Sequence, residues 1–341
     1  MGKANLAVGR MMERPDIFAD YVNGTTFGGR QVLSPEDLEL ISTHGGEITE
    51  DEKGHSKVHE LEGDIRMKGS MGTYSVILVG ELQSHVHYAM PVRDMRYVSE
   101  EYKKQLEDIE KKHKEKKDLM TSDEFLSKFA KDDKLMPVAS SVLYWGTKWD
   151  GPTELYDMLD FGDGREAEAL KEYVPNYKIK VVSMAEFENP DVFRSCLQHI
   201  FRMVQCKEDR KQLEEYINVH KDEFQQMDSV EKEAVVMILG EGTKVARQFE
   251  KAVEEGRVEE FDMCGAFKQM IEDGKVEGKI ESKIELVCKK LQKNKTVEVI
   301  ADEMEEDIAF IEKIVNFVEA FAPEYDVEKM LAAWIEQNPT R

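Results

Sequence analysis

The sequence has little cysteine, little positive charge and no long apolar run. Its four cysteines are scattered on segments with helical patterning and form no Cys-x-x-Cys pair. This excludes a sequence-evident zinc site or disulfide framework and favours reduced core thiols. The 47 Lys and Arg residues stand against 70 Asp and Glu residues, giving a net charge of −23 at pH 7. A surface this negative repels polyphosphate at long range. It excludes an architectural DNA coat and a basic lipid-binding patch, and any nucleic-acid role requires a local site.

No stretch of the chain suits a membrane or an export signal. The longest run without a charged side chain, Leu135 to Thr147, falls well short of the roughly 20 residues that a membrane helix needs. The first residues lack the apolar run of a secretory signal, and Gly2 lacks the Ser or Thr that usually completes a myristoylation motif. We therefore expect a cytoplasmic protein without a membrane partner.

The apolar content is enough for a large globular core. Hydrophobic residues make up 41% of the 341 positions, which suits two domains. Strand patterns stop before Asn189-Pro190, and only helical patterns follow. The sequence therefore predicts an α/β domain over residues 1–188 and an all-helical domain over residues 189–341.

The longest helical pattern in the C-terminal half, near residues 261–292, contains Gly265, Gly274 and Gly278. Glycine inside a helix costs about 1 kcal/mol relative to alanine, so these positions need an explanation. Two remain open: close helix contact in a homo-oligomer formed through the C-terminal helices, or a merely weak helix.

Several local signals organise the first half of the chain. Pro15 predicts a helix start, and Asn23-Gly24 predicts its end. Ser34-Pro35 predicts a second helix that covers Leu38 to Ile41. Residues 45–59 are polar and rich in glycine, which predicts a loop or an uncertain strand.

The clearest feature is a β-hairpin with strands over residues 61–67 and 74–83 and a turn between them. If paired positions sum to 145, the turn centres on the turn-forming Gly72-Thr73, and Asp64 lies opposite Glu81. Two facing carboxylates repel each other unless a divalent cation lies between them.

Strand alternation predicts that Glu81 and Gln83 share one face of the hairpin while Leu82 faces the other way. The carboxylate oxygens of Asp64 and Glu81 suit Mg²⁺ or Mn²⁺. The alternative is a half-buried strand whose polar side chains face solvent. Further along the chain, Pro91 opens a long polar helix to about Lys117, and residues 138–145 and 177–183 predict two more strands.

These segments together resemble a known family. The order is DIFADYVNG, VLSPEDLELI, Asp64, VGELQS, YAMPVRDMRYVSEEY and VASSVLYWGTKWDGPTELYDML, within residues 14–205. It resembles the PD-(D/E)XK nuclease family transposases, a group close to the recombination-promoting nucleases. The resemblance implies a restriction-endonuclease-like mixed sheet flanked by helices and a Mg²⁺- or Mn²⁺-dependent DNA endonuclease that hydrolyses phosphodiester bonds.

The resemblance also implies roles for individual residues. Asp64 matches the metal-binding aspartate and Glu81 the metal-binding glutamate. Gln83 occupies the position that is Lys in the wider superfamily and is usually Gln in this branch. As a neutral group, Gln83 would orient a water molecule or hydrogen-bond the scissile phosphate. Leu82 departs from the family, which usually has a sequence such as ENQ here.

An acidic residue of the first helix often completes such sites, and Asp20 or Asp16 would serve. Arg93 and Tyr97 lie one turn apart on the helix after Pro91, and they would either contact a phosphate or brace the hairpin. His85 and His87 form a His-x-His pair on the face of Gln83 if the strand continues. A transition-metal site there lacks an evident third ligand.

Two further hypotheses concern partners. The protein could be a catalytically silent nuclease-fold module that acts through interactions or DNA association, with its helical half making the contacts. Residues 111–117, KKHKEKK, would lie along a DNA backbone or form a solvated helix face. A helix-turn-helix within residues 296–314 conflicts with 12 acidic and 3 basic residues over positions 296–341, a net charge of −9, so docking onto the chain itself or a partner subunit is favoured.

Overall fold

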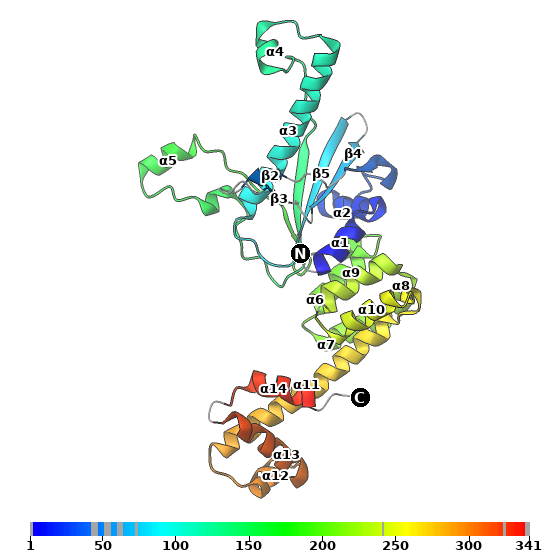
Figure 1. The fold of residues 1–341 in the computed structure, drawn as a ribbon, viewed down its shortest axis with the longest axis vertical. Helices are drawn as coiled ribbons and strands as arrows, with labels where there is room; N and C mark the ends of the chain where they lie inside the picture. Colours follow the sequence, from blue (N-terminus) through cyan, green and yellow to red (C-terminus); the bar gives the residue numbers. More distant parts are fainter. Residues whose placement is uncertain are drawn as a thin grey trace. The chain divides into compact units, whose positions relative to one another are not determined.

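The structure is a computed structural model that describes residues 3–41, 47–50, 56–59, 64–71, 74–240, 242–322 and 325–337. It is a mixed α/β protein in which N-terminal helices and a five-stranded mixed sheet precede a largely helical C-terminal half, as predicted (Figure 1). The elements of the first half are α1 (Lys3–Met12), α2 (Pro15–Phe27), β1 (Leu38–Leu40), β2 (Glu47–Glu50), β3 (Ser56–His59), β4 (Asp64–Met71), β5 (Tyr74–Gln83), α3 (Met90–Lys116), α4 (Ser122–Ser127), β6 (Val138–Tyr144), α5 (Arg165–Lys171) and β7 (Val181–Ser183).

The remaining elements are helices. They are α6 (Leu197–Cys206), α7 (Arg210–Val219), α8 (Lys221–Gln226), α9 (Ser229–Gly240), α10 (Lys244–Glu254), α11 (Met263–Leu291), α12 (Val297–Met304), α13 (Ile308–Val318) and α14 (Val327–Gln337).

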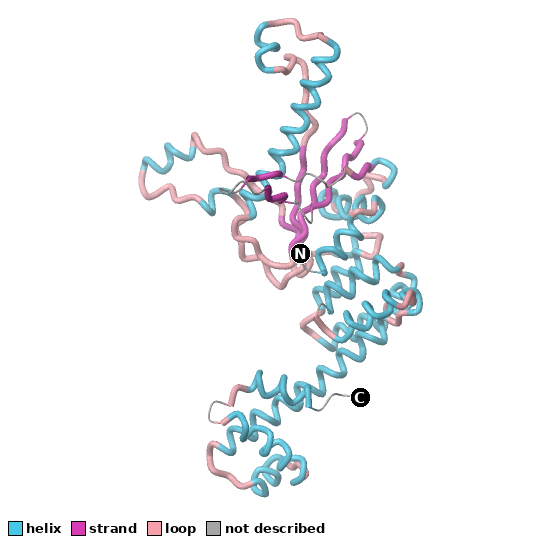
Figure 2. Tube along the Cα trace, in the orientation of Figure 1, coloured by secondary structure: helices cyan, strands magenta, loops and turns pink. Residues whose placement is uncertain are grey.

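The strands are drawn in magenta in Figure 2. The main sheet has the strand order β1-β4-β5-β6-β7. β4 pairs antiparallel with β1 and β5, whereas β6 pairs parallel with β5 and β7. The predicted hairpin register is confirmed, because Asp64 pairs with Glu81 and Met71 with Tyr74. β5 is therefore a central strand with an antiparallel neighbour on one side and a parallel neighbour on the other.

Helices cover the two faces of this sheet differently. α2 contacts one face through the Phe18 ring near Gly80 and through the Tyr21 hydroxyl, 3.0 Å from Ser141 Oγ. α3 contacts the opposite face, where Arg93 reaches Glu81 of β5. Side chains alternate along a strand, so neighbouring positions such as 80 and 81 meet different helices.

The start of the chain shows two departures from the sequence predictions. Asn23-Gly24 does not end the helix, because α2 continues to Phe27. The Asn23 side chain is buried and bonds the backbone of Val32 and Leu33. A Cβ on Gly24 would lie 2.3 Å from Cε1 of Phe193. The Asn-Gly pair therefore permits close packing instead of breaking the helix.

The helix predicted after Ser34 is also wrong. Pro35–Asp37 forms only a 3₁₀ turn with a Ser34–Asp37 capping box, and β1 follows at Leu38. Between residues 45 and 59, the described parts form the hairpin of β2 and β3, and the rest lies outside the described residues. The helices α1, α4, α5 and α8 had no predicted counterpart.

The chain forms two compact units, residues 1–261 and 262–341. The two compact units divide between residues 261 and 262, and the change from strands to helices predicted at 188/189 occurs after β7. α1 packs against α9, and the Asp20 carboxylate of α2 holds the backbone N–H groups of Arg194 and Ser195. The helices between residues 189 and 261 therefore belong to the first unit.

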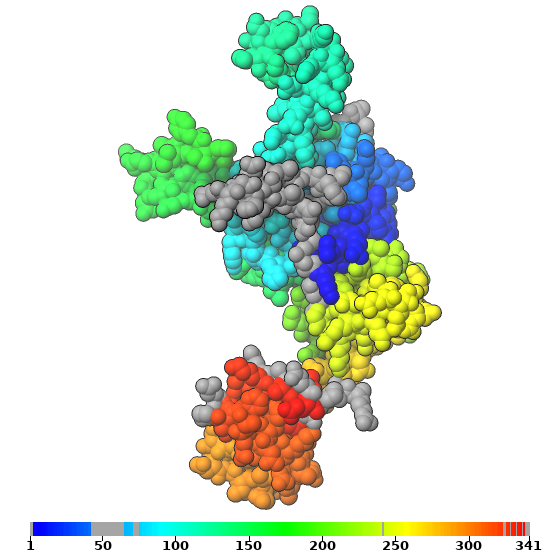
Figure 3. All heavy atoms as spheres, viewed as in Figure 1, coloured from blue at the N-terminus to red at the C-terminus, as the bar shows by residue number. Residues whose placement is uncertain are grey.

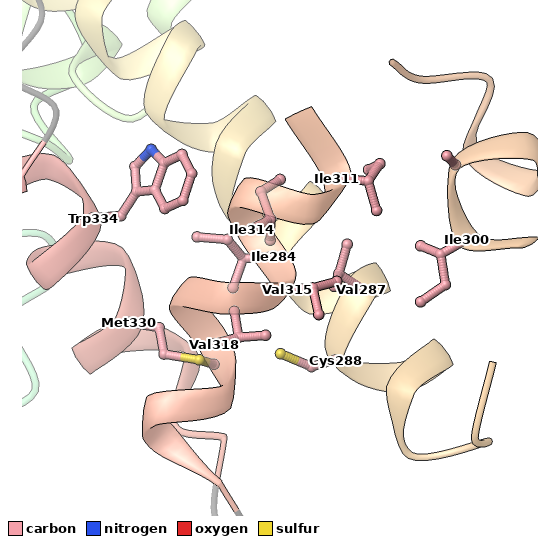
Figure 4. Packing of buried hydrophobic residues seen from close by; sticks show 11 residues of the cluster. Ile284, Val287, Cys288, Ile300, Ile311, Ile314, Val315, Val318, Met330 and Trp334 are labelled. Carbon is pink, nitrogen blue, oxygen red and sulfur yellow. The ribbon is translucent and has the colours of Figure 1, made fainter. Parts of the chain in front are cut away.

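The second unit has its own apolar core, built from α11, α12, α13 and α14 (Figure 4). The pair of helices α12 and α13 packs into this core with α11 and α14. The N–H of Gly265 donates a hydrogen bond to the side chain of the N-cap residue Asp262. A Cβ on Gly278 would have no atom within 4 Å. Within this unit, neither glycine shows a close helix contact. No helix in the described part of the chain combines the length and the apolar character that crossing a bilayer requires.

At the end of α3, the His113 ring contacts two aspartates from the segments on either side of α4. His113 Nδ1 lies 2.6 Å from Asp118 Oδ1, and its Nε2 lies 2.7 Å from Asp133 Oδ2. Hydrogen bonds to both carboxylates raise the pKa of His113 above its ordinary 6.5, and the same contacts lower both aspartate pKa values from 3.8. The ring therefore ties the end of the helix to the chain on either side of α4.

Replacing Gly24 by Ala tests the close contact with Phe193. Overpacking of this kind costs about 1–3 kcal/mol of unfolding free energy. Gly9→Ala in α1 is the matched control, because its Cβ would lie 3.7 Å from Leu82, an ordinary contact. We expect urea unfolding to show destabilisation of Gly24→Ala and no loss for Gly9→Ala. Equal midpoints for both variants would contradict the contact.

The His113 contacts predict a pH-dependent stability. The raised pKa means that the contribution is present at pH 6 and is lost as pH rises through the folded-state pKa. The difference in Tm between wild type and His113→Asn should therefore be larger at pH 6 than at pH 9. His85→Asn, at an exposed position, serves as control. A Tm difference for His113→Asn that does not change with pH would rule out this role.

Candidate functional site

Glu81 is a fully buried carboxylate near the end of the central strand β5. Its exposed fraction is 0%. It pairs in register with Asp64 of β4 on one side and with Val142 of β6 on the other. Burying an unpaired carboxylate is costly, so this position requires a compensating positive group. The side chain of Asp64 lies outside the described residues.

Arg93, in the first turn of α3, supplies positive charge to Glu81. Its Nε lies 3.3 Å from Glu81 Oε2 and donates a 3.0 Å hydrogen bond to the Tyr97 hydroxyl. The guanidinium carbon also lies 5.5 Å from the centroid of the Tyr97 ring. Tyr97 is buried, whereas the Arg93 side chain keeps 29% of its surface exposed. Arg93 thus contacts the hairpin through Glu81, and its contact with a phosphate stays a prediction.

Next to Arg93, Asp94 joins α3 to β6 and to the segment before β7 through a buried network that sequence reasoning missed. Its Oδ2 accepts hydrogen bonds from Ser140 Oγ at 2.8 Å and from the Tyr177 hydroxyl at 2.5 Å. Burial raises the pKa of Tyr177, and the charges of Asp94 and Glu81 raise it further. Asp94 Oδ1 is buried and has no hydrogen-bond partner among the residues that the structure describes. Asp94 thus lies on the same sheet face as Glu81.

A second buried ion pair holds α3 to the hairpin. Arg66 of β4 and Glu101 of α3 approach to 2.9 Å, with side chains only 1% and 6% exposed. Lys104 adds a 3.0 Å contact to the same carboxylate. Arg66 is two positions from Asp64, so this pair fixes the strand that carries the predicted metal-binding aspartate.

Gln83 is the last residue of β5. Its side chain is half-buried, and its backbone carbonyl accepts a 3.3 Å hydrogen bond from the Trp145 N–H. Because β5 ends at Gln83, the predicted His-x-His pair does not continue the strand. His85 is exposed and bonds Ser84, while burial and the charge of Arg93 lower the pKa of His87.

The structure does not bring Asp20 or Asp16 to Glu81. The Asp20 Oδ2 accepts three hydrogen bonds, from Arg194 N and Ser195 N, both at 2.8 Å, and from Ser195 Oγ at 2.6 Å. Its helix α2 covers the sheet face opposite Glu81. Asp16 pairs with Arg14 at 2.7 Å. Asp20 therefore anchors the segment before α6, and sequence alone could not reveal this because Ser195 lies 175 positions away.

The described side chains contain no group of three or more His, Cys, Asp or Glu residues spaced to hold a metal ion. Glu81 is thus the described ligand candidate, with Asp64 its register partner. Comparison of the chain with family models, curated proteins and solved structures gave no match.

Removal of Arg93 tests its contact with Glu81. Breaking a largely buried ion pair leaves a carboxylate without its cation, and Arg93→Met should lower the unfolding free energy by about 2 kcal/mol. The double variant with Glu81→Gln should recover part of this loss. Lys103→Met removes an exposed pair on the same helix, and its effect should stay below about 0.5 kcal/mol. Additive effects in the double variant would contradict the interaction.

Proposed function

We propose that this protein is a metal-dependent DNA endonuclease associated with transposition or recombination. The observation that carries the proposal is the pairing of Asp64 with Glu81 on adjacent strands, with Glu81 fully buried. Directly paired residues of an antiparallel ladder share one face. The carboxylates of this pair are thus candidates to hold one divalent cation together.

The donor chemistry fits a hard cation. Glu81 would contribute carboxylate oxygens, and Asp64, its register partner on β4, would contribute a second carboxylate. Such oxygen ligands suit Mg²⁺ or Mn²⁺. A cation held by Asp64 and Glu81 would lower the pKa of a bound water and offset charge on a phosphodiester.

The surrounding residues have positioning roles in this proposal. Arg93 and Tyr97 fix the Glu81 carboxylate, and the exposed part of Arg93 would contact a phosphate oxygen. Gln83 would orient the attacking water or bond the scissile phosphate. Asp20 is left out, because its carboxylate is engaged on the other side of the sheet.

The fold supports the family resemblance. The resemblance implies a mixed sheet flanked by helices with its acidic residues on a hairpin. Here α2, the β4–β5 hairpin, α3 and the parallel strand β6 follow one another in that arrangement.

A catalytically silent, interacting module is the second candidate. The observation that favours it is the Arg93–Glu81 contact, which already compensates the buried carboxylate without a metal ion. The two candidates differ in whether a divalent cation changes the chemistry at Glu81.

Nicking of supercoiled plasmid in the presence of Mg²⁺ or Mn²⁺ separates the two candidates. We expect wild type to nick and EDTA to abolish nicking. Asp64→Asn and Glu81→Gln should each reduce the rate by about 100-fold or more, because each removes a charged oxygen ligand. Glu107→Gln, an exposed change on α3, is the control and should cleave at the wild-type rate.

Manganese binding by calorimetry gives an independent measurement. Wild type should bind, and Glu81→Gln should bind at least tenfold more weakly. Wild type that neither nicks DNA nor binds Mn²⁺ would overturn the endonuclease proposal and favour the silent module. Both site variants nicking at the wild-type rate would show that the site is placed wrongly.

A further inference from the structure

Residues 111–134, at the far end of α3 and around α4, form a projecting tip with an unusual charge for this chain. This tip stands away from the sheet within the first compact unit (Figures 1 and 3). It contains eight lysines and six acidic residues, a net charge of +2, in a protein whose total charge is −23. All eight lysines are exposed: Lys111, Lys112, Lys114, Lys116, Lys117, Lys128, Lys131 and Lys134.

Half of the acidic groups in the tip are engaged within it. Asp118 and Asp133 both bond His113, whose pKa they raise, so the ring is favoured in its cationic form. Glu124 accepts hydrogen bonds from three backbone N–H groups of the tip, those of Met120, Thr121 and Lys131.

The lysines are not engaged in the same way. Within the described part of the chain, none of the eight has an ion-pair partner, in contrast to Lys103 and Lys104 earlier on the same helix. The tip therefore presents eight lysines to solvent, while three of its six carboxylates are engaged in contacts within the tip.

The tip is held in a defined orientation. At its base, the Gln105 side chain bonds both the N–H and the carbonyl of Met136, at 2.7 and 3.2 Å. The Tyr102 hydroxyl accepts a bond from the Val138 N–H, so the returning chain is fixed where β6 begins. Such a base fixes the direction of the tip relative to the strand that carries Glu81.

Large apolar side chains are also exposed at this tip. Met120 and Leu126 are each 86% exposed, and Phe125 is 56% exposed. Apolar side chains exposed among lysines are suited to contact with a partner.

We propose that residues 111–134 form a DNA-contacting arm, with the lysines on the phosphate backbone and Phe125 and Leu126 against the sugars and base edges of a groove. The charge complementarity favours a polyanion, since the rest of the chain repels one. Apolar side chains at such a contact act as wedges or pack on the groove wall. The inference rests on the proposed function for its choice of DNA, and it deepens that function by naming a second contact away from Glu81.

The test is fluorescence anisotropy with a labelled 30-base-pair duplex at several salt concentrations in EDTA, so that cleavage plays no part. Each lysine–phosphate contact adds about 0.9 to the slope of log K against log salt. The triple variant Lys114→Gln, Lys128→Gln, Lys131→Gln should lower the magnitude of the slope by about 2–3. Its affinity at low salt should fall at least tenfold.

The matched control changes three exposed lysines elsewhere in the same unit, Lys103→Gln, Lys211→Gln and Lys251→Gln, for the same change in net charge. Its slope should equal that of wild type. The pair Phe125→Ser, Leu126→Ser should weaken binding without changing the slope. Circular dichroism checks that each variant is folded.

Several outcomes would overturn the inference. Wild type that does not bind duplex at low salt would do so, as would a lysine variant with the wild-type slope. A Phe125→Ser, Leu126→Ser variant that turns a dimer into a monomer and leaves DNA binding intact would assign the surface to a second copy of the chain.

The inference and the endonuclease proposal fail separately. If the lysine variant lowers the salt slope but wild type does not nick DNA, the DNA-contacting arm stands and the endonuclease proposal fails. If wild type nicks DNA but the lysine variant keeps the wild-type slope, the endonuclease proposal stands and the arm fails.

Discussion

The contact between Glu81 and Arg93 is the interaction around which the first unit is arranged. A carboxylate at 0% exposure in a central strand needs a positive partner, and that partner must come from an element fixed over the sheet. α3 is fixed in three ways: Pro91 begins its first turn, the buried Arg66–Glu101 pair holds it to β4, and Asp94 holds it to Ser140 of β6. The position of the helix, and of everything beyond it, follows from these polar contacts.

The two faces of the sheet are stabilised by different physics. On the α2 side, the Phe18 ring packs near Gly80, and the Tyr21 hydroxyl shares one hydrogen bond with Ser141. On the α3 side, ion pairs and hydrogen bonds dominate. A buried polar network specifies one geometry more narrowly than apolar contacts do, and it tolerates the loss of a member less well. Chemistry that requires fixed distances is better placed on the second face.

Local patterns were sufficient for some of this structure and insufficient for the rest. The hairpin and its register followed from strand alternation and from the turn residues around Gly72, and α3 followed from Pro91. The helix break at Asn23-Gly24 was wrong because Phe193, far along the chain, fills the space that the glycine leaves. The placement of Asp20 was wrong and the role of Asp94 was missed for a similar reason, because sequence spacing does not say which helix covers which face of the sheet.

The packing of α1 against α9 has a consequence for synthesis of the chain. The apolar face of α1, which includes Val8 and Met11 at 0% exposure, is synthesised long before the helix that covers it. Its partner α9 ends at Gly240, so more than two hundred further residues must be synthesised before α1 can pack against α9. At translation rates of roughly 5–20 residues per second, this interval lasts on the order of 10–50 s. During that interval the nascent chain displays an unpaired apolar helix, the kind of segment that chaperones recognise, before the N-terminal unit can close.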